Sequence, residues 1–344
     1  MSGNSSWRNR HFGSALALGV GATAAAGWVL RHRNAARAVV TEQDIESEGL
    51  TLPRDLQHHF VDVDDGGRIH VVEGGTGPAV VLLHGFMLDA SIWSHQFRDL
   101  SDRYRVIAID HRGHGESQPG VAGFTAPEAS ENATRETWRS AEPMAGAAVN
   151  PPGIRRLTAD LVAVLEELDI SRALVVGHSM GGMVALQLAL DSSVMDRRIC
   201  GLVLTSTLAG PLVALPGWAN LARFTSPASA LVASLAERLG VRTLPSQDLR
   251  YWLSRVGFGG DAPLAQVRFV EALHMATSSR TRAGLLPSLA VFDLSASLRS
   301  IEEPVLVVVG SHDRLTPPRA ARRMAGALPH AQLVEFARCG HMPM

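Results

Sequence analysis

Short apolar runs alternate with amphipathic segments along two parts of the chain. Two runs of alternating apolar and polar residues, separated by Asp65-Gly66-Gly67, predict a β-hairpin. Largely apolar runs are typical of strands buried on both faces, and they occur at 79–83, 105–109, 173–176, 199–205 and 304–310. Residues 331–336 are predicted to form the last strand. Apolar residues with helical spacing occur at 92–100, 157–168, 183–190 and 318–328. This order predicts an α/β fold with a mostly parallel sheet flanked by helices.

The alternation stops over residues 206–298, where four segments have helical spacing: 231–239, 247–256, 262–275 and 282–292. We predict a helical cap over the strand ends here, and a core domain made of 56–205 and 299–344. The alternative is a separate domain with its own role, which we favour less because the sheet pattern resumes afterwards. A second long stretch, 118–153, exceeds a normal connection and is expected to be an excursion near the strand ends.

The first 55 residues differ from the rest, and we interpret 1–55 as a hydrophobic segment followed by a linker. Residues 14–30 are 17 residues without a charge, and arginines flank them on both sides. Three interpretations are open: a membrane anchor, a cleaved signal peptide, or a soluble alanine-rich helix. We favour an anchor, hence a transmembrane helix, because a signal peptide carries its charge on the N-terminal side. The protein is then membrane-associated, and otherwise secreted or cytoplasmic.

Composition narrows the classes of function. Hydrophobic residues make up 46% of the chain and charged residues 19%, which excludes global disorder. The net charge of −1 offers no electrostatic case for binding nucleic acid. Cys200 and Cys339 are the two cysteines, too few for a disulfide framework or a thiolate zinc site.

The candidate nucleophile is Ser179, in the run Gly177-His178-Ser179-Met180-Gly181 between a predicted strand and a predicted helix. A Gly-x-Ser-x-Gly turn in this context is strained, and it lifts the serine hydroxyl clear of the sheet. The alternative is an ordinary tight turn of small residues. The strand before it and the helix after it favour the nucleophile.

Acyl transfer by a serine also needs a base and a carboxylate that orients the base. Asp313 follows the predicted strand at 304–310, and His341 follows the last strand. The chain order Ser179, Asp313, His341 is the one expected when strand-end loops of such a sheet assemble a triad. Asp313 could instead be a turn or N-cap residue, and His341 a loop histidine without a role. His312 is interpreted as a neighbour of the acid loop.

The oxyanion formed during acyl transfer needs backbone N–H donors. We predict Met180, the residue after the nucleophile, and Phe86, in the loop after the strand at 79–83. His84 and His178 are interpreted as residues that position turns. The spacing of His111 and His114 fits no metal site, so we predict no bound metal.

Five segments together resemble the α/β-hydrolase superfamily, in its esterase, lactonase, haloperoxidase-like and C–C hydrolase branch. They are HGFMLDASIW (84–93), YRVIAIDHRGHGES (104–117), LVVGHSMGGMVAL (174–186), VLVVVGSHDRLTPP (305–318) and CGHMP (339–343). The resemblance implies an α/β-hydrolase fold with a helical lid, no cofactor, the triad Ser179, Asp313 and His341, and the oxyanion donors Phe86 and Met180. Related haloalkane dehalogenases and epoxide hydrolases have aspartate as the nucleophile, so Ser179 disfavours both.

One feature departs from the family, whose members usually continue past the histidine with a helix that covers the sheet. Only Met342, Pro343 and Met344 follow His341 here. Two interpretations are open: the chain is a truncated product, or the sheet has uncovered apolar surface. We expect low solubility.

The sequence predicts a serine hydrolase that cleaves a carboxylic ester or lactone through an acyl-enzyme. Apolar cap segments favour a small-molecule substrate with an apolar acyl part. Two alternatives stay open: C–C bond hydrolysis or perhydrolysis on the same triad, and a non-catalytic membrane-tethered member of the fold. The sequence does not indicate an oligomeric state.

Overall fold

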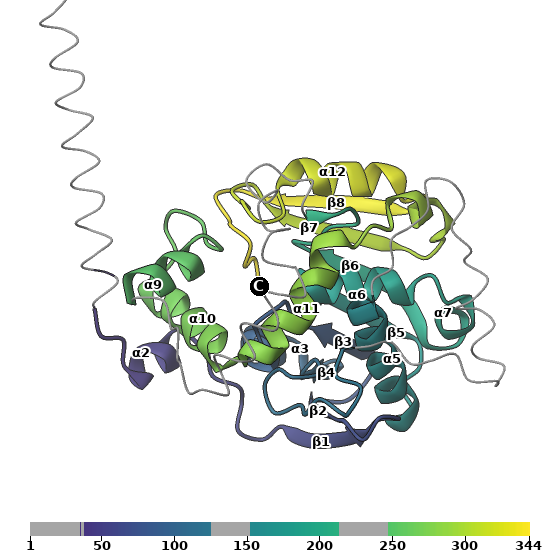
Figure 1. The fold of residues 1–344 in the computed structure, drawn as a ribbon, viewed down its shortest axis with the longest axis horizontal. Coiled ribbons are helices and arrows are strands. Elements are labelled where there is room, and N and C mark those ends of the chain that lie inside the picture. The colour runs from purple at the N-terminus through teal and green to yellow at the C-terminus, as the bar shows by residue number, and fades with distance from the viewer. Residues whose placement is uncertain (1–34, 36–37, 125–151, 213–246) are drawn as a thin grey trace, which may run out of the picture.

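The structure is a computed structural model that describes residues 35, 38–124, 152–212 and 247–344. Eight strands in these residues form one sheet in the order β1-β2-β4-β3-β5-β6-β7-β8. Their bounds are β1 Gln57–Asp62, β2 Arg68–Gly74, β3 Ala79–Leu83, β4 Arg105–Ile109, β5 Ala173–His178, β6 Ile199–Thr205, β7 Val305–Gly310 and β8 Ala331–Phe336. Figure 1 shows the sheet from β1 at the bottom to β8 at the top.

The pairing of the strands confirms the predicted hairpin and the predicted mostly parallel sheet. β1 and β2 form the predicted antiparallel hairpin, and β2 also pairs antiparallel with β4. All pairs from β4 through β3, β5, β6 and β7 to β8 are parallel. Parallel strands end at one edge of a sheet, so the loops after β3, β5, β7 and β8 meet there.

Helices flank the sheet and connect its strands. The described ones are α2 Glu42–Ser47, η1 Ala90–Trp93, α3 Ser94–Leu100, α5 Pro152–Glu167, α6 Met180–Leu188, α7 Ser192–Arg198, α9 Gln247–Arg255, α10 Leu264–Ala276, α11 Ser279–Val291, η4 Ser295–Ser300 and α12 Pro318–Ala327. Every helix predicted from apolar spacing within the described residues is present, with ends shifted by a few residues. The segment 231–239 lies outside the described residues, as does 125–151 of the excursion.

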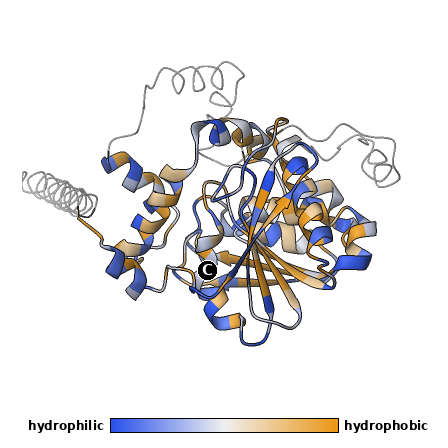
Figure 2. Cartoon of the chain, turned by 90° about the horizontal axis from the view of Figure 1, so that it is seen from below, coloured by the Kyte–Doolittle hydropathy of each residue, from blue (hydrophilic) through white to orange (hydrophobic). Residues whose placement is uncertain are grey.

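The apolar core lies on both faces of the sheet because alternate residues of each strand point to opposite sides. Val81 and Leu83 of β3 belong to the core cluster that includes residues of α5 and α6, whereas Val80 and Leu82 belong to the cluster that includes residues of η1 and α3. Figure 2 shows this as hydrophobic strands at the centre and hydrophilic outer faces on many of the helices. Burial on both faces explains why these strands are continuous apolar runs in the sequence.

The helices of the predicted cap lie at different places. α9 and α10 contact each other to one side of the sheet, where α10 also contacts α2 (Figure 1). Tyr251 of α9 and Val267 of α10 form a small apolar cluster of their own. α11 instead packs on α5, and its Leu285 and Leu289 belong to the main core.

Two α-helices, α2 and α7, and the 3₁₀-helix η4 were not predicted from apolar spacing. α2 lies inside the stretch interpreted as a linker, and α7 follows directly after α6. Both are short and begin at an N-cap side chain: Thr41 accepts a hydrogen bond from Asp44 N, and Asp191 accepts from Ser193 N and Val194 N. Capping residues define such helices, and α2 has no buried side chain that would give it a pattern.

The predicted anchor at 14–30 lies outside the described residues. Among the helices of the described part, none combines the length and the apolar character needed to cross a bilayer. Apolar side chains are exposed on the edge strand β8, where Val334 is 38% and Phe336 46% exposed. Low solubility stays a prediction.

Candidate active site

Ser179 occupies the turn between β5 and α6 with φ 52° and ψ −113°, a conformation that costs a non-glycine residue about 1–3 kcal/mol. Gly177 and Gly181 make the turn possible. A Cβ on Gly177 would lie 2.4 Å from the Gly181 carbonyl oxygen, and one on Gly181 would lie 2.2 Å from that of Leu83. The turn therefore has the tight geometry expected from the Gly-x-Ser-x-Gly pattern.

Hydrogen bonds with the end of β6 and with the residues just after it hold the strained backbone in place. Ser179 N donates to the Thr205 carbonyl oxygen at 2.9 Å. Thr207 Oγ1 donates to the Ser179 carbonyl oxygen at 2.6 Å. Sequence reasoning did not identify Thr207, because its contact depends on β6 ending beside β5.

Asp313 and His341 form a buried pair. His341 Nδ1 lies 2.9 Å from Asp313 Oδ2, and the side chains are 8% and 0% exposed. An ionised carboxylate can only accept, so Nδ1 carries the proton and Nε2 keeps its lone pair. This is the tautomer that a histidine needs to act as a base through Nε2.

The carboxylate of Asp313 is anchored by its own loop. Leu315 N and Thr316 N donate to Oδ1, and Thr316 Oγ1 donates to Oδ2 at 2.6 Å. Burial alone would raise the pKa of Asp313, but the charge of His341 and hydrogen bonds from His341 and Thr316 hold that pKa below its ordinary value. Asp313 thus serves as a turn residue and as the partner of His341. Thr316 is a further polar residue of the site that sequence reasoning missed.

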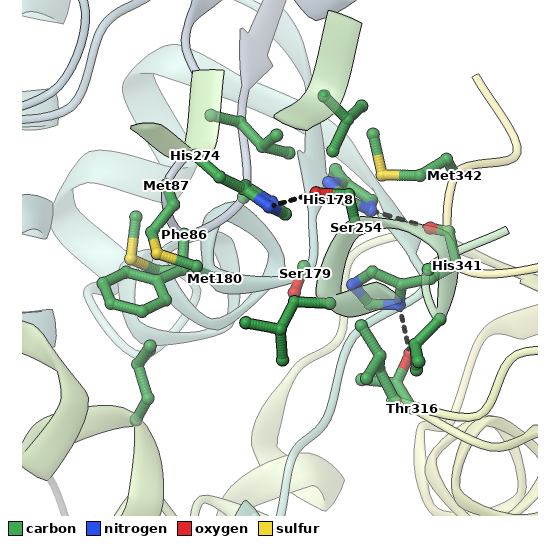
Figure 3. A pocket seen from close by; sticks show the side chains of 18 of the residues that line it. Phe86, Met87, His178, Ser179, Met180, Ser254, His274, Thr316, His341 and Met342 are labelled. Carbon is green, nitrogen blue, oxygen red and sulfur yellow. Dashed lines mark hydrogen bonds between the residues drawn. The ribbon is translucent and has the colours of Figure 1, made fainter. Parts of the chain in front are cut away.

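Ser179 and His341 come together at this edge of the sheet. Both side chains line one cavity, and Figure 3 shows Ser179 and Thr316 beside different edges of the His341 ring. Nδ1 is directed to Thr316 and Asp313, so the ring presents its other edge to Ser179. No hydrogen bond joins the two side chains in this structure, and such bonds often tighten only when substrate binds.

His178 supports the loop that carries His341. Its Nε2 donates to the His341 carbonyl oxygen at 2.8 Å, and the two rings lie 4.8 Å apart between centroids. Burial, together with the charge of His341, lowers the pKa of His178 to about 3. A neutral, hydrogen-bonded ring fits the predicted positioning role and not that of a base.

The loop after β3 lies against the nucleophile turn. A Cβ on Gly85 would lie 3.1 Å from Ser179 Cβ, so the backbone that leads into Phe86 passes close to the serine. Met180 is the first residue of α6, and its N–H has no acceptor within the helix. Phe86 and Met180 both line the cavity at Ser179. Their role as oxyanion donors stays a prediction.

A cluster of neutral histidines fixes that loop. His84 Nε2 accepts from His111 N at 2.9 Å, and His114 Nε2 accepts from Met87 N at 3.2 Å. Burial lowers the pKa of His111 to about 3 and that of His114 to about 4, with neighbouring His114 lowering His111 further. His84 therefore positions a turn, as predicted, and His111 and His114 take part in the hydrogen bonds that hold it.

Ser179 and His341 open into a cavity of about 540 Å³. Its walls are mostly apolar: Phe86, Met87, Leu88, Met180, Met183, Leu208, Leu212, Leu253, Val256, Val270, Met275, Leu289, Leu315 and Met342. Arg250 and Arg282 also line it. A mostly apolar cavity with few polar groups is typical of small-molecule sites.

A second serine–histidine contact lines the same cavity. Ser254 Oγ of α9 and His274 Nδ1 of α10 lie 3.1 Å apart (Figure 3). Burial and the charges of Arg282 and His341 lower the pKa of His274 to about 4. Within the described residues no carboxylate forms an ion pair with His274. His274 is thus a much weaker base than a histidine that a carboxylate supports.

Comparison with known proteins agrees with the fold. The family described as alpha/beta hydrolase fold matches residues 78–344. A pimeloyl-[acyl-carrier protein] methyl ester esterase from Nitrosomonas europaea is 28% identical over 80% of this chain and 93% of that protein. An esterase from Thermogutta terrifontis is 25% identical with a TM-score of 0.61, and covers 83% of this chain and 92% of its own. The esterase EaEST from Exiguobacterium antarcticum is 20% identical over the same shares and has a TM-score of 0.64, a likeness of fold.

Proposed function

This chain is a hydrolase of the α/β-hydrolase fold family, and we propose that it cleaves carboxylic esters through Ser179, His341 and Asp313. The observation that carries the proposal is the buried Asp313–His341 pair beside a serine in a strained strand-to-helix turn. Nucleophile, base and orienting carboxylate are the three groups that acyl transfer requires.

In the first half of the reaction, Ser179 Oγ attacks the ester carbonyl carbon and gives its proton to His341 Nε2. Asp313 holds the ring and stabilises the imidazolium that forms. The N–H groups of Phe86 and Met180 donate hydrogen bonds to the negatively charged tetrahedral oxygen, and one such donor contributes roughly 3 kcal/mol. The alcohol leaves with the proton from His341, and an acyl-enzyme remains on Ser179.

In the second half, His341 takes a proton from a water molecule, which attacks the acyl carbonyl carbon. The second tetrahedral intermediate collapses, Ser179 recovers its proton, and the carboxylic acid leaves. A lactone reacts by the same steps, with the alcohol and acid in one product. The scheme needs no cofactor.

The apolar walls of the cavity support a substrate with an apolar acyl part. Apolar side chains from the loop after β3, from α6 and from α10 meet there. Burying one methylene against such walls is worth about 0.8 kcal/mol. The relative that is an esterase of a pimeloyl methyl ester acts on an ester with an aliphatic acyl chain, which supports the same class.

The test is a panel of p-nitrophenyl esters graded by acyl length, assayed on the wild type and on two serine variants. Ser179→Ala should lower kcat by at least ~10⁴-fold for every ester, because the nucleophile is gone. Ser254→Ala is the matched control: it removes a second serine hydroxyl of the cavity, the one that lies 3.1 Å from His274 Nδ1. We expect it to change KM more than kcat and to keep kcat within about ten-fold.

Turnover that persists in Ser179→Ala but disappears in Ser254→Ala would move the chemistry to the Ser254–His274 pair. If the wild type hydrolyses none of the esters, but cleaves a C–C bond substrate or forms a peracid from peroxide and a carboxylic acid, the alternative reactions on the same triad are favoured.

Membrane attachment through residues 14–30 is also a proposal, supported by the uncharged stretch and its flanking arginines. Carbonate-washed membranes that retain the full-length protein, but lose a variant lacking residues 1–45, support it. Full-length protein recovered in the wash contradicts it.

A further inference from the structure

A second histidine–carboxylate pair lies outside the cavity lining, where β2 meets the loop after β4. His70 Nδ1 lies 2.7 Å from Asp110 Oδ2, and the side chains are 3% and 4% exposed. His70 and Asp110 take no part in the reaction described above, and neither lines the cavity. This buried ionisable pair has no role in the proposed reaction, and its function depends on what binds the Nε2 side of the His70 ring.

The free nitrogen of His70 points at two other potential metal ligands. His70 Nε2 lies 2.9 Å from His58 Nδ1 of the neighbouring strand β1. Glu116, in the loop after β4, brings a carboxylate into the same place: ligand atoms of His58, His70 and Glu116 all lie within 4.8 Å of one another. His58 and Glu116 are exposed and His70 is buried, so the group opens to solvent on one side.

Hydrogen bonds to Asp110 fix the positions of His70 and of the Glu116 backbone. Its Oδ2 accepts from His70 Nδ1 and from Glu116 N at 2.9 Å, and its Oδ1 accepts from Ala90 N at 2.7 Å. A carboxylate on Nδ1 leaves the Nε2 lone pair free and makes it more basic, which is how proteins orient metal-binding histidines.

The loop that carries Glu116 is also tied to the strand that carries His70. Ser117 Oγ donates to the Asp110 carbonyl oxygen at 2.6 Å and accepts from His70 N at 2.8 Å. Gln118 and Arg68 exchange both of their backbone hydrogen bonds. The backbone at His70 and at Glu116 is therefore ordered before an ion binds, which lowers the entropic cost of forming the site.

We propose that His58, His70 and Glu116 bind a divalent transition-metal ion, with Zn²⁺ as the representative. Two imidazole nitrogens on one zinc ion at about 2.1 Å lie roughly 3.0–3.4 Å apart. The observed 2.9 Å between His58 Nδ1 and His70 Nε2 therefore has to lengthen only slightly to admit the ion. The exposed Glu116 side chain then has to move its carboxylate toward the two imidazoles. Imidazole with carboxylate favours zinc, nickel or copper over magnesium and calcium.

The competing explanation is a hydrogen-bond relay from Asp110 through His70 to His58, without a metal. The two differ in what Glu116 does, because a relay does not need a third ligand. They also differ in consequence: a bound ion joins β1, β2 and the loop after β4 and stabilises the folded state as its concentration rises.

The experiment is calorimetric titration of the chelator-treated full chain with ZnCl₂. His59→Ala is the matched control, because His59 is the next residue on β1, points to the other face and pairs with Glu73. We expect a site in the wild type that His59→Ala keeps. His58→Ala and Glu116→Gln should each weaken that site by at least about ten-fold.

A cobalt titration adds a readout of ligand type. Co²⁺ in the wild type should give a visible d–d absorption that is absent in His58→Ala and present in His59→Ala. The proposal is overturned if the wild type takes up no zinc, or if His58→Ala and Glu116→Gln bind it with wild-type stoichiometry and affinity. Loss of binding in His58→Ala alone, with Glu116→Gln unchanged, also contradicts the three-ligand site.

Discussion

Two buried histidine–carboxylate pairs in this molecule have nearly the same geometry. Asp313 and His341 are 2.9 Å apart at the edge where the parallel strands end, and Asp110 and His70 are 2.7 Å apart beside the hairpin. In both pairs burial alone would raise the pKa of the carboxyl group. Hydrogen bonds and the nearby histidines hold that pKa below its ordinary value instead.

The two pairs differ in what faces the free edge of the ring. His341 has the hydroxyl of Ser179 and an apolar cavity beside it. His70 has a second imidazole and an exposed carboxylate. A carboxylate on Nδ1 prepares a histidine to give its Nε2 lone pair to a proton or to a metal ion. The neighbouring residues therefore select the chemistry.

The largest expected effect separates the two histidines. His341→Gln should lower kcat for ester hydrolysis by about 10⁴-fold, because no base remains for Ser179. His70→Gln should keep kcat within about ten-fold per folded molecule and lower the melting temperature, because Asp110 loses a buried partner. Equal losses of kcat in the two variants would break the comparison.

The carboxylates should differ in the same way. Asp313→Asn should lower kcat by about 10³- to 10⁴-fold with little change in KM, because the amide stabilises the wrong tautomer of His341. Asp110→Asn should act on stability more than on kcat. Steady-state kinetics and thermal melts on both variants check this, and an Asp313→Asn enzyme with near-normal kcat would refute the role of Asp313.

A smaller effect is expected at Thr316, whose hydroxyl donates to Asp313 Oδ2. Loss of a hydrogen bond to a charged group costs about 1.5 kcal/mol, or roughly ten-fold. Thr316→Val should lower kcat by that factor, and Thr316→Ser, which keeps the hydroxyl, should restore it. A serine variant as slow as the valine variant would show that shape, and not the hydrogen bond, is what matters.

The smallest effect per residue concerns the buried neutral histidines. The pKa values of His111, His114, His178 and His274 fall to about 3–4 in the fold, against about 6.5 unfolded. Below pH 6.5 these histidines bind protons in the unfolded chain but stay neutral in the folded chain. Stability is therefore full above pH 6.5 and falls toward pH 4, by on the order of 1 kcal/mol per histidine at pH 5.5.

Urea midpoints at pH 7.5, 6.5, 5.5 and 4.5 check this expectation. A midpoint that does not change over that range would contradict the neutral state of these rings.

Strand-end motifs explain how much of the active site the sequence predicted. Ser179 and Asp313 each follow an apolar run and His341 follows the last predicted strand, so chain order alone indicated that they meet at one edge. Thr316, Ser254 and His274 could not be found this way. Their contacts depend on side-chain geometry within a loop or between two helices.

The cluster of His58, His70 and Glu116 could not be predicted from the sequence for a similar reason. His58, His70 and Glu116 come from three segments whose register brings them together, and no fixed spacing in the chain reveals that. The fold itself was easier to predict, because burial on both faces gives the strands unbroken apolar runs. Short helices such as α7 depend on capping residues and not on apolar spacing.

The most direct test of the account is to label the wild-type protein with a fluorophosphonate probe and to map the adduct by peptide mass spectrometry. We expect a single modified residue, Ser179, and no labelling of Ser179→Ala under the same conditions. An adduct on Ser254, or labelling of Ser179→Ala at the wild-type rate, would contradict it.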